Sequence, residues 1–94
     1  MFSYKIFRVP KEVLVSVCDQ EVLGKKLDEN FEVDEKFYGG KNCGKDEIRK
    51  ILEEATIINA VGNIIVDFLI NENFVEKEKT IKIGGVLHAQ VAKL

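Results

Sequence analysis

The sequence predicts an α+β fold: a two-layer sandwich in which two main helices pack on one face of a mixed or antiparallel sheet. Segments rich in β-branched and aromatic residues stand at both ends of the chain, and two stretches with helical spacing of apolar residues lie between them. The chain has 94 residues, of which 46% are hydrophobic. This length suits one core, so residues 1–94 are expected to form a single domain.

The first two segments, YKIFRV and EVLVSVC, predict a pair of strands. They flank Pro10 and Lys11, which are typical of a tight turn. Val13, Val15 and Val17 share one face of the second strand, because side chains alternate along a strand. We therefore expect an amino-terminal β-hairpin with one apolar face.

The next two segments predict a short helical turn and then a third strand. In DQEVLGKKL, Asp19 is a natural N-cap, and Gly24 suits the left-handed conformation that ends a helix. The stretch FEVDEKFYGG alternates apolar and charged residues, which is typical of a half-buried strand. Gly39 and Gly40 are expected to end that strand.

Two helices are expected in the middle of the chain. After Gly44, the segment DEIRKILEEA has the apolar spacing of an amphipathic surface helix. The stretch TIINAVGNIIVDFLINENF predicts a second helix that should be the most buried element, so an Ile64→Asp substitution is expected to unfold the domain. Gly62 within this helix indicates that a neighbouring element packs closely. Asn59 is expected to cap, to bond a loop backbone or to face a ligand.

The last segments, TIKI and VLHAQVAKL, predict two strands joined by a turn at Gly84 and Gly85. In a strand over residues 86–92, His88 and Gln90 share one face. They are then either a structural pair that satisfies backbone groups or a pair that reads a ligand.

The charge of the chain excludes a global positive field of the kind that draws a protein onto nucleic acid. Fourteen basic and sixteen acidic side chains give a net charge of -2 and a pI near 5.4. Residues 1–26 are nevertheless mildly basic, whereas residues 27–60 are acidic. The basic residues of the first part either form one phosphate-contacting face or are scattered solubilising side chains: Lys5, Arg8, Lys11, Lys25 and Lys26.

The cysteines and the apolar runs indicate a compartment. Cys18 and Cys43 are not preceded by an apolar leader, which predicts a cytoplasmic, reduced protein. The longest apolar run, IINAVGNIIVDFLI, is interrupted by polar residues and is too short to span a bilayer. We therefore expect no membrane partner.

The only histidine, His88, lacks companions for chemistry. No CxxC, HxxxH or HxH pair occurs, and the neighbouring carboxylates stand in adjacent pairs on solvated faces or at helix starts. We expect no metal, no cofactor and no catalytic residue, and an enzyme is poorly supported. An enzyme or ligand carrier would need a pocket that gathers His88, Gln90 and Asn59.

Two glycine pairs, Gly39 with Gly40 and Gly84 with Gly85, are expected to form turns. Neither pair belongs to a GxGxxG or GxxxxGK[ST] pattern. The first pair lies in FYGGKN, whose Tyr38 and neighbouring phenylalanine and lysine suit stacking on a base next to a positive charge.

Four segments, DQEVLGK, FYGG, EEATIINAVG and IGGVLHAQ, together resemble a small archaeal family known as domain of unknown function 424. The resemblance covers nearly the whole chain and implies RNA binding and an association with translation or the ribosome. The positions that match the family are Gly24, Tyr38, Gly39, Gly40, Asn59, Gly62, Gly84, Gly85, His88 and Gln90.

These observations favour a non-catalytic module that binds ribosomal or transfer RNA or a ribosome-associated protein, with no indication of DNA. The alternatives are a protein-interaction adaptor that uses an exposed strand edge or the tail VAKL, and a small ligand-binding protein or enzyme with a pocket near His88. The expected recognition residues are Lys5, Arg8, Lys25, Lys26, Tyr38, Gly39, Gly40, Asn59, Gly84, Gly85, His88 and Gln90.

Overall fold

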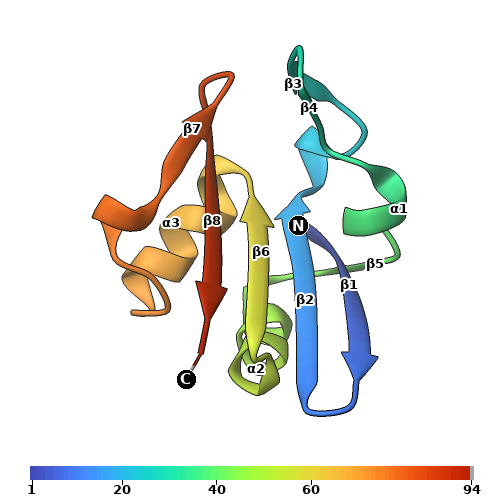
Figure 1. Cartoon of the computed structure of the whole chain (residues 1–94), viewed down its shortest axis with the longest axis vertical. Coiled ribbons are helices and arrows are strands. Elements are labelled where there is room, and N and C mark those ends of the chain that lie inside the picture. Colours follow the sequence, from blue (N-terminus) through green and yellow to red (C-terminus); the bar gives the residue numbers. More distant parts are fainter. Residues whose placement is uncertain (94) are drawn as a thin grey trace.

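A computed structural model describes residues 1–93, which fold into a mixed sheet with two helices on one face (Figure 1). The sheet strands are β1 (Phe2–Val9), β2 (Glu12–Asp19), β5 (Lys41–Cys43), β6 (Ile57–Val61), β7 (Ile81–Ile83) and β8 (Val86–Ala92). Their spatial order is β5-β1-β2-β6-β8-β7. β2 and β6 are parallel, and every other neighbouring pair is antiparallel. The predicted fold class is confirmed.

The remaining elements lie on the two sides of this sheet. They are η1 (Gln20–Val22), β3 (Lys26–Asp28), β4 (Phe31–Glu32), α1 (Glu35–Tyr38), α2 (Lys45–Glu54), α3 (Asn63–Asn71) and η2 (Lys77–Lys79). In Figure 1, α2 and α3 lie behind the sheet, whereas the β3–β4 hairpin and α1 lie beyond its upper and right-hand parts. β5 passes along the free edge of β1 and connects α1 to α2.

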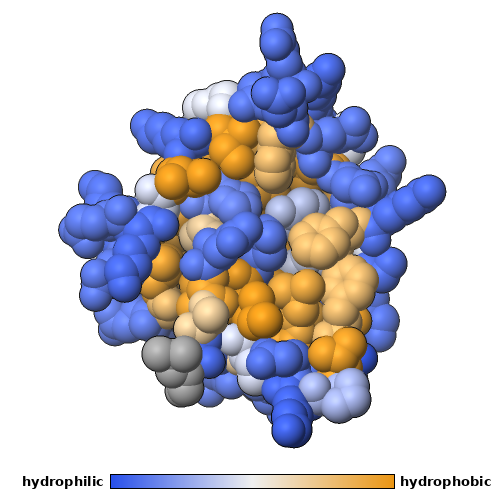
Figure 2. Space-filling model, viewed as in Figure 1, coloured by the Kyte–Doolittle hydropathy of each residue, from blue (hydrophilic) through white to orange (hydrophobic). Residues whose placement is uncertain are grey.

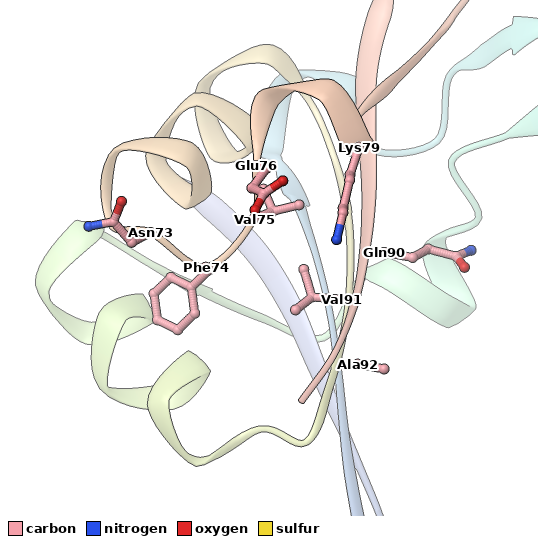
Figure 3. A pocket seen from close by; sticks show the side chains of 8 residues that line it. All are labelled: Asn73, Phe74, Val75, Glu76, Lys79, Gln90, Val91 and Ala92. Atoms are coloured by element: carbon pink, nitrogen blue, oxygen red, sulfur yellow. The ribbon is translucent and has the colours of Figure 1, made fainter. Parts of the chain in front are cut away.

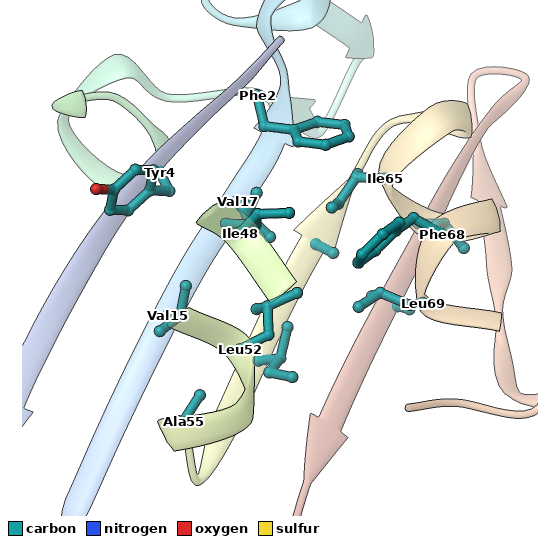
Figure 4. Close-up of a cluster of buried hydrophobic side chains, with 14 of the residues drawn as sticks. Phe2, Tyr4, Val15, Val17, Ile48, Leu52, Ala55, Ile65, Phe68 and Leu69 are labelled. Carbon is teal, nitrogen blue, oxygen red and sulfur yellow. The ribbon is translucent and has the colours of Figure 1, made fainter. Parts of the chain in front are cut away.

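The main core fills the space between the sheet and the two longer helices (Figure 4). Alternate residues of β2 and β6, including Val15, Val17 and Ile58, point toward Ile48 and Leu52 of α2, and all five are fully buried. The helix-facing side of α3 completes this core with Ile65, Val66, Phe68 and Leu69. Burial of this apolar surface is the dominant favourable contribution to folding.

The long helix predicted over residues 56–74 is wrong, because the chain forms a strand and then a shorter helix. β6 pairs with β2 on one side and with β8 on the other, and α3 begins after Gly62. Every residue of this central strand is at least half-buried, so its sequence is apolar except at Asn59, and the run into α3 extends it. Periodicity alone therefore cannot separate this strand from a buried helix.

Asp19, at the end of β2, joins the sheet to α3. Its carboxylate accepts hydrogen bonds from the backbone N–H groups of Ile64 and Ile65, both at 2.9 Å. These are two of the N–H groups that the start of a helix leaves without a partner. Burial raises the pKa of the Asp19 carboxyl, and the two amide donors oppose that shift. Asp19 precedes η1 as predicted, but its side chain caps α3 and makes no cap bond to η1.

Gly62 gives the Asp19 carboxylate room to reach α3. Its φ of 131° is unfavourable for residues with a side chain. A Cβ atom at this position would lie 2.5 Å from the carboxyl carbon of Asp19. The close packing expected at Gly62 is therefore present, but its cause is a strand-to-helix junction.

The strand predicted in FEVDEKFYGG is also wrong beyond Glu32. The Asp34 side chain accepts a hydrogen bond from the Lys36 backbone N–H at 2.9 Å and caps α1. Such a side-chain bond to the backbone offers the chain an alternative to strand pairing, and here it starts a helical turn although the apolar and charged residues alternate. Gly39 and Gly40 consequently follow a helical turn and lead into β5.

The expectation for Ile64→Asp fails, because the Ile64 side chain is 50% exposed, whereas Ile65 is fully buried. We expect Ile65→Asp to abolish cooperative folding, since it buries an unpaired carboxylate. Ile64→Asp should retain the fold, with a free energy of unfolding within about 1 kcal/mol of the wild type. Urea unfolding followed by circular dichroism checks both values. Equal losses for the two variants would contradict the assigned faces of α3.

Replacing Asp19 should detach the first turn of α3 from the sheet. We expect Asp19→Ala to lower the free energy of unfolding by about 2 kcal/mol, because two helix amides, one buried and one partly buried, lose their acceptor. The matched control is Asp34→Ala, which removes an exposed cap from α1 and should cost less than about 1 kcal/mol. A smaller loss for Asp19→Ala than for the control would disprove the role of this carboxylate.

Candidate functional site

The candidate site is the sheet face opposite α2 and α3, which we call the open face. Figure 2 shows it from the same side as Figure 1, with apolar side chains reaching the surface between polar ones. Part of this face is covered by the segment from β3 to α1, which encloses a second core around Cys18, Val33, Tyr38 and Val61. The remainder of the face, toward the β1–β2 turn and the end of β8, has no layer over it.

An aromatic pair lies at the border between the covered and uncovered parts of the open face. Phe7 of β1 and Phe37 of α1 are half-buried, and their rings stack at 5.4 Å between centroids with an interplanar angle of 22°. The Lys5 ammonium lies 5.5 Å from the centre of the Phe7 ring and donates to the Lys36 carbonyl at 2.9 Å. The pair thus combines exposed aromatic surface with an adjacent positive charge.

Hydrogen bonds from the sheet hold α1 in this position. The Ser3 hydroxyl donates to the Tyr38 carbonyl at 3.2 Å, and the Ser16 hydroxyl donates to the Phe37 carbonyl. Both serines are buried, and both are on the open face of their strands. They satisfy carbonyl groups at the end of a helix too short to pair them internally.

Tyr38 connects α1 to the centre of the open face. Its hydroxyl donates to Oδ1 of Asn59 at 2.5 Å. Burial raises the pKa of Tyr38 to about 12, so the hydroxyl remains a donor at neutral pH. Asn59 stands opposite Gln90 in the β6–β8 register, and these two amide side chains share the open face. The exposed Gln90 amide offers both a donor and an acceptor to solvent.

His88 lies on the same face, two residues before Gln90. It is 6% exposed, and its ring meets the edge of Phe31 at 5.7 Å between centroids. Burial lowers the pKa of His88, so the imidazole is neutral at pH 7. A hollow of about 270 Å³ adjoins His88 and Gln90, but Asn59 is not among its lining residues. The pocket that an enzyme would need therefore gathers only two of the three expected side chains.

The thiols are held in unreactive environments. Cys18 belongs to the second core and Cys43 to the main core. Burial raises the pKa of Cys18 to about 12 and that of Cys43 to about 11, so both remain protonated at neutral pH. Within residues 1–93, no group of three or more His, Cys, Asp or Glu side chains is placed to hold a metal ion.

The basic residues expected to contact phosphate do not lie on one surface. Lys5 projects from the open face, whereas Arg8, an odd number of positions away on β1, projects from the other face. Lys25 precedes β3, and Lys26 begins it, opposite Glu32. Among these four, only Lys5 lies beside the aromatic pair.

The two glycine pairs differ in their roles: Gly39 and Gly40 link α1 to β5, with Gly40 next to Tyr4 and Lys5, and only the second pair forms a turn. Gly84 and Gly85 have φ values of 56° and 81° and connect β7 to β8. A Cβ atom on Gly84 would lie 1.9 Å from the Leu27 carbonyl oxygen, so this turn packs directly on the β3–β4 hairpin. The predicted turn at Gly84 and Gly85 is confirmed, and the structure adds that Gly84 packs against the backbone of Leu27.

Phe7 was not among the recognition residues predicted from the sequence. The alternation of side chains along β1 could have identified it. Tyr4 belongs to the main core and Ile6 packs against it, so Phe7 must point to the opposite face. The anchoring role of Ser16 had no comparable signal, because a serine in an apolar strand does not indicate its acceptor.

Comparisons with known proteins agree on a family and a fold. The family model described as Protein of unknown function (DUF424) matches residues 7–94. The chain is also similar to a crystal structure of an uncharacterized conserved protein from Methanopyrus kandleri, with 23% identity and a TM-score of 0.79. That likeness covers 99% of this chain and 93% of the other and concerns the fold alone. None of the curated proteins compared matches the chain. No helix within residues 1–93 has the length and apolar character needed to cross a membrane.

The lowered pKa of His88 predicts a pH dependence of stability. The unfolded chain binds a proton at the ordinary histidine pKa of 6.5, whereas the folded protein binds it only at lower pH. The free energy of unfolding should therefore fall as the pH decreases below about 6.5. We expect His88→Gln to flatten this dependence between pH 7 and 5.5; Asp19, whose pKa is raised by burial, is present in both proteins and contributes equally to both. Urea unfolding at several pH values measures it, and identical slopes for the two proteins would contradict the prediction.

Proposed function

Because this chain belongs to the DUF424 family, a family described only as of unknown function, we propose from its own surface that the open face binds single-stranded RNA. The observation that carries the proposal is the half-exposed Phe7–Phe37 pair, with Lys5 beside it, where the cover of the open face by α1 ends. Unpaired segments of ribosomal or transfer RNA are the partners we expect.

Stacking supplies the first part of the binding. Every nucleobase has an aromatic face, and stacking on an aromatic side chain contributes about 1–3 kcal/mol per base. Phe7 is fixed on a strand, and Phe37 is fixed through the bond between its carbonyl and Ser16. Their stacking surface is thus already ordered before a base arrives, which reduces the entropy lost on binding.

Hydrogen bonding supplies the second part. Unstacked bases of single-stranded RNA present donors and acceptors along their edges. Gln90 and Asn59 lie side by side on the open face, and the Tyr38 hydroxyl fixes the orientation of the Asn59 amide through Oδ1. His88, two residues before Gln90, is buried against Phe31, so Gln90 and Asn59 are the amides that reach the surface here. In the strand register these two amides lie level with Lys5, one row of side chains from Phe7.

The charge distribution supports weak electrostatic attraction. Lys5 lies beside the aromatic pair, whereas Arg8, Lys25 and Lys26 lie elsewhere. Each neutralised phosphate contributes about -0.7 to the salt slope of single-strand binding. With one or two phosphate contacts, we therefore expect a slope of about -1, and affinity should come mainly from stacking.

The aromatic pair and the placement of Lys5 can be tested with a fluorescently labelled single-stranded RNA of mixed sequence. We expect Phe7→Ala and Phe37→Ala each to weaken binding about 5-fold or more, because each removes a stacking surface. Lys5→Glu should weaken it as well. The matched control is Arg8→Glu, which makes the same charge change on the same strand but on the opposite face. Fluorescence anisotropy at low salt gives the dissociation constants.

Two results would refute RNA binding at the open face. One is the absence of binding by the folded wild-type protein at low salt. The other is an equal effect of Lys5→Glu and Arg8→Glu, since a non-specific electrostatic contact would not distinguish the two faces. Circular dichroism of every variant establishes that the fold is retained.

A further inference from the structure

We infer that the free edge of β8 binds an extended peptide of a partner protein as an added strand. β7 is short and pairs only with the first residues of β8, from Val86 to His88. β8 continues to Ala92, and its last residues pair only with β6. Below the end of β7 the sheet therefore has an open edge, which we call the β8 notch.

The hydrogen-bond register determines which peptide groups point into the β8 notch. The Gly62 N–H donates to the Leu87 carbonyl at 2.9 Å, and the Lys93 N–H donates to the Thr56 carbonyl at 2.8 Å. In an antiparallel ladder, peptide groups alternate between the two edges of a strand. Odd-numbered residues of β8 thus bond to β6, and even-numbered residues face the other edge.

Gln90 and Ala92 are the even-numbered residues beyond the reach of β7. Their two N–H and two C=O groups point into the β8 notch and have no backbone partner among residues 1–93. Another strand satisfies such a row with its own alternating donors and acceptors. The spacing of these four groups therefore specifies an extended peptide rather than a helix or a compact ligand.

The space beside this edge is hollow enough for side chains. A groove of about 470 Å³ lies between β8 and the chain that follows α3 (Figure 3). In Figure 3, Val91 points toward Val75 and Phe74 on one side of the strand, and Gln90 points to the other side. An added strand would place alternate side chains against the apolar wall, which favours a peptide with an apolar residue there.

The charge at the groove selects between two kinds of occupant. Lys79 extends along the β8 edge in Figure 3 and takes part in no ion pair among residues 1–93; it also borders the hollow beside His88 and Gln90, whereas Glu76 lines the groove next to Val75. A second copy paired edge to edge would bring two such lysines together over a contact of only a few residues, far fewer than the roughly 20–30 residues per side of a stable interface. A peptide with an acidic side chain on the Gln90 side instead meets Lys79 with opposite charge.

A phage-displayed library of random twelve-residue peptides tests the inference with the folded full chain as bait. We expect enriched peptides to alternate apolar and polar residues, with an acidic residue among the polar ones. Fluorescence anisotropy of the strongest peptide should show at least 10-fold weaker binding to Ala92→Pro, which removes one outward N–H group. Lys79→Glu should also weaken binding, whereas the matched control Lys77→Glu, a lysine of the same η2 turn, should not.

A second measurement does not depend on the proline variant. Amide hydrogen exchange of the wild-type protein should slow at Gln90 and Ala92 when the peptide binds, whereas Ala89 and Val91, which already bond to β6, should change little. Enrichment of no peptide, equal binding to Ala92→Pro, or exchange changes confined to the open face would overturn the inference. A dimer of the free protein that Ala92→Pro abolishes, without peptide enrichment, would assign the edge to a second copy and overturn it as well.

Discussion

The bond between the Asp19 carboxylate and the start of α3 is the interaction on which the arrangement of the two layers depends. It connects the end of a central strand to two helix amides and requires a residue without a side chain at Gly62. Because the chain turns at this point, α3 returns across the sheet with Ile65 and Leu69 against the main core. The same turn leaves Ile57–Val61 in the sheet, where β6 places Asn59 on the opposite face.

The second face of the sheet is organised by a different set of contacts. The segment from β3 to α1 is too small for a core of its own, so it covers only the part of the sheet around Cys18 and Val61. Hydrogen bonds from Ser3 and Ser16 to α1 carbonyls, and from Tyr38 to Asn59, fix its position. The result is a sheet with one face largely covered by α2 and α3 and one partly covered face, whose side chains remain exposed where the cover ends.

The two thiols, the imidazole and the carboxylate at the end of β2 are held in unreactive environments. Both thiols are protonated, the imidazole is neutral, and the Asp19 carboxylate bonds to helix amides. Besides exposed charged side chains, the open face and the edge of β8 leave aromatic surface, amide side chains and strand backbone accessible. Such groups recognise a partner through stacking and hydrogen bonds, so the open face and the β8 notch are suited to two different partners.

The sequence by itself determined the fold class, the β1–β2 hairpin, α2 and the closing β7–β8 hairpin, because local alternation, helical spacing and glycine turns agree there with the final structure. It also placed His88 and Gln90 on one face. It could not separate β6 from α3, because a largely buried central strand and a buried helix have similarly apolar sequences. Only tertiary structure brought Asp19 to Gly62, Tyr38 to Asn59 and Phe7 to Phe37, since these contacts join residues far apart in the chain. Their formation depends on which strands become neighbours, and no local pattern encodes that choice.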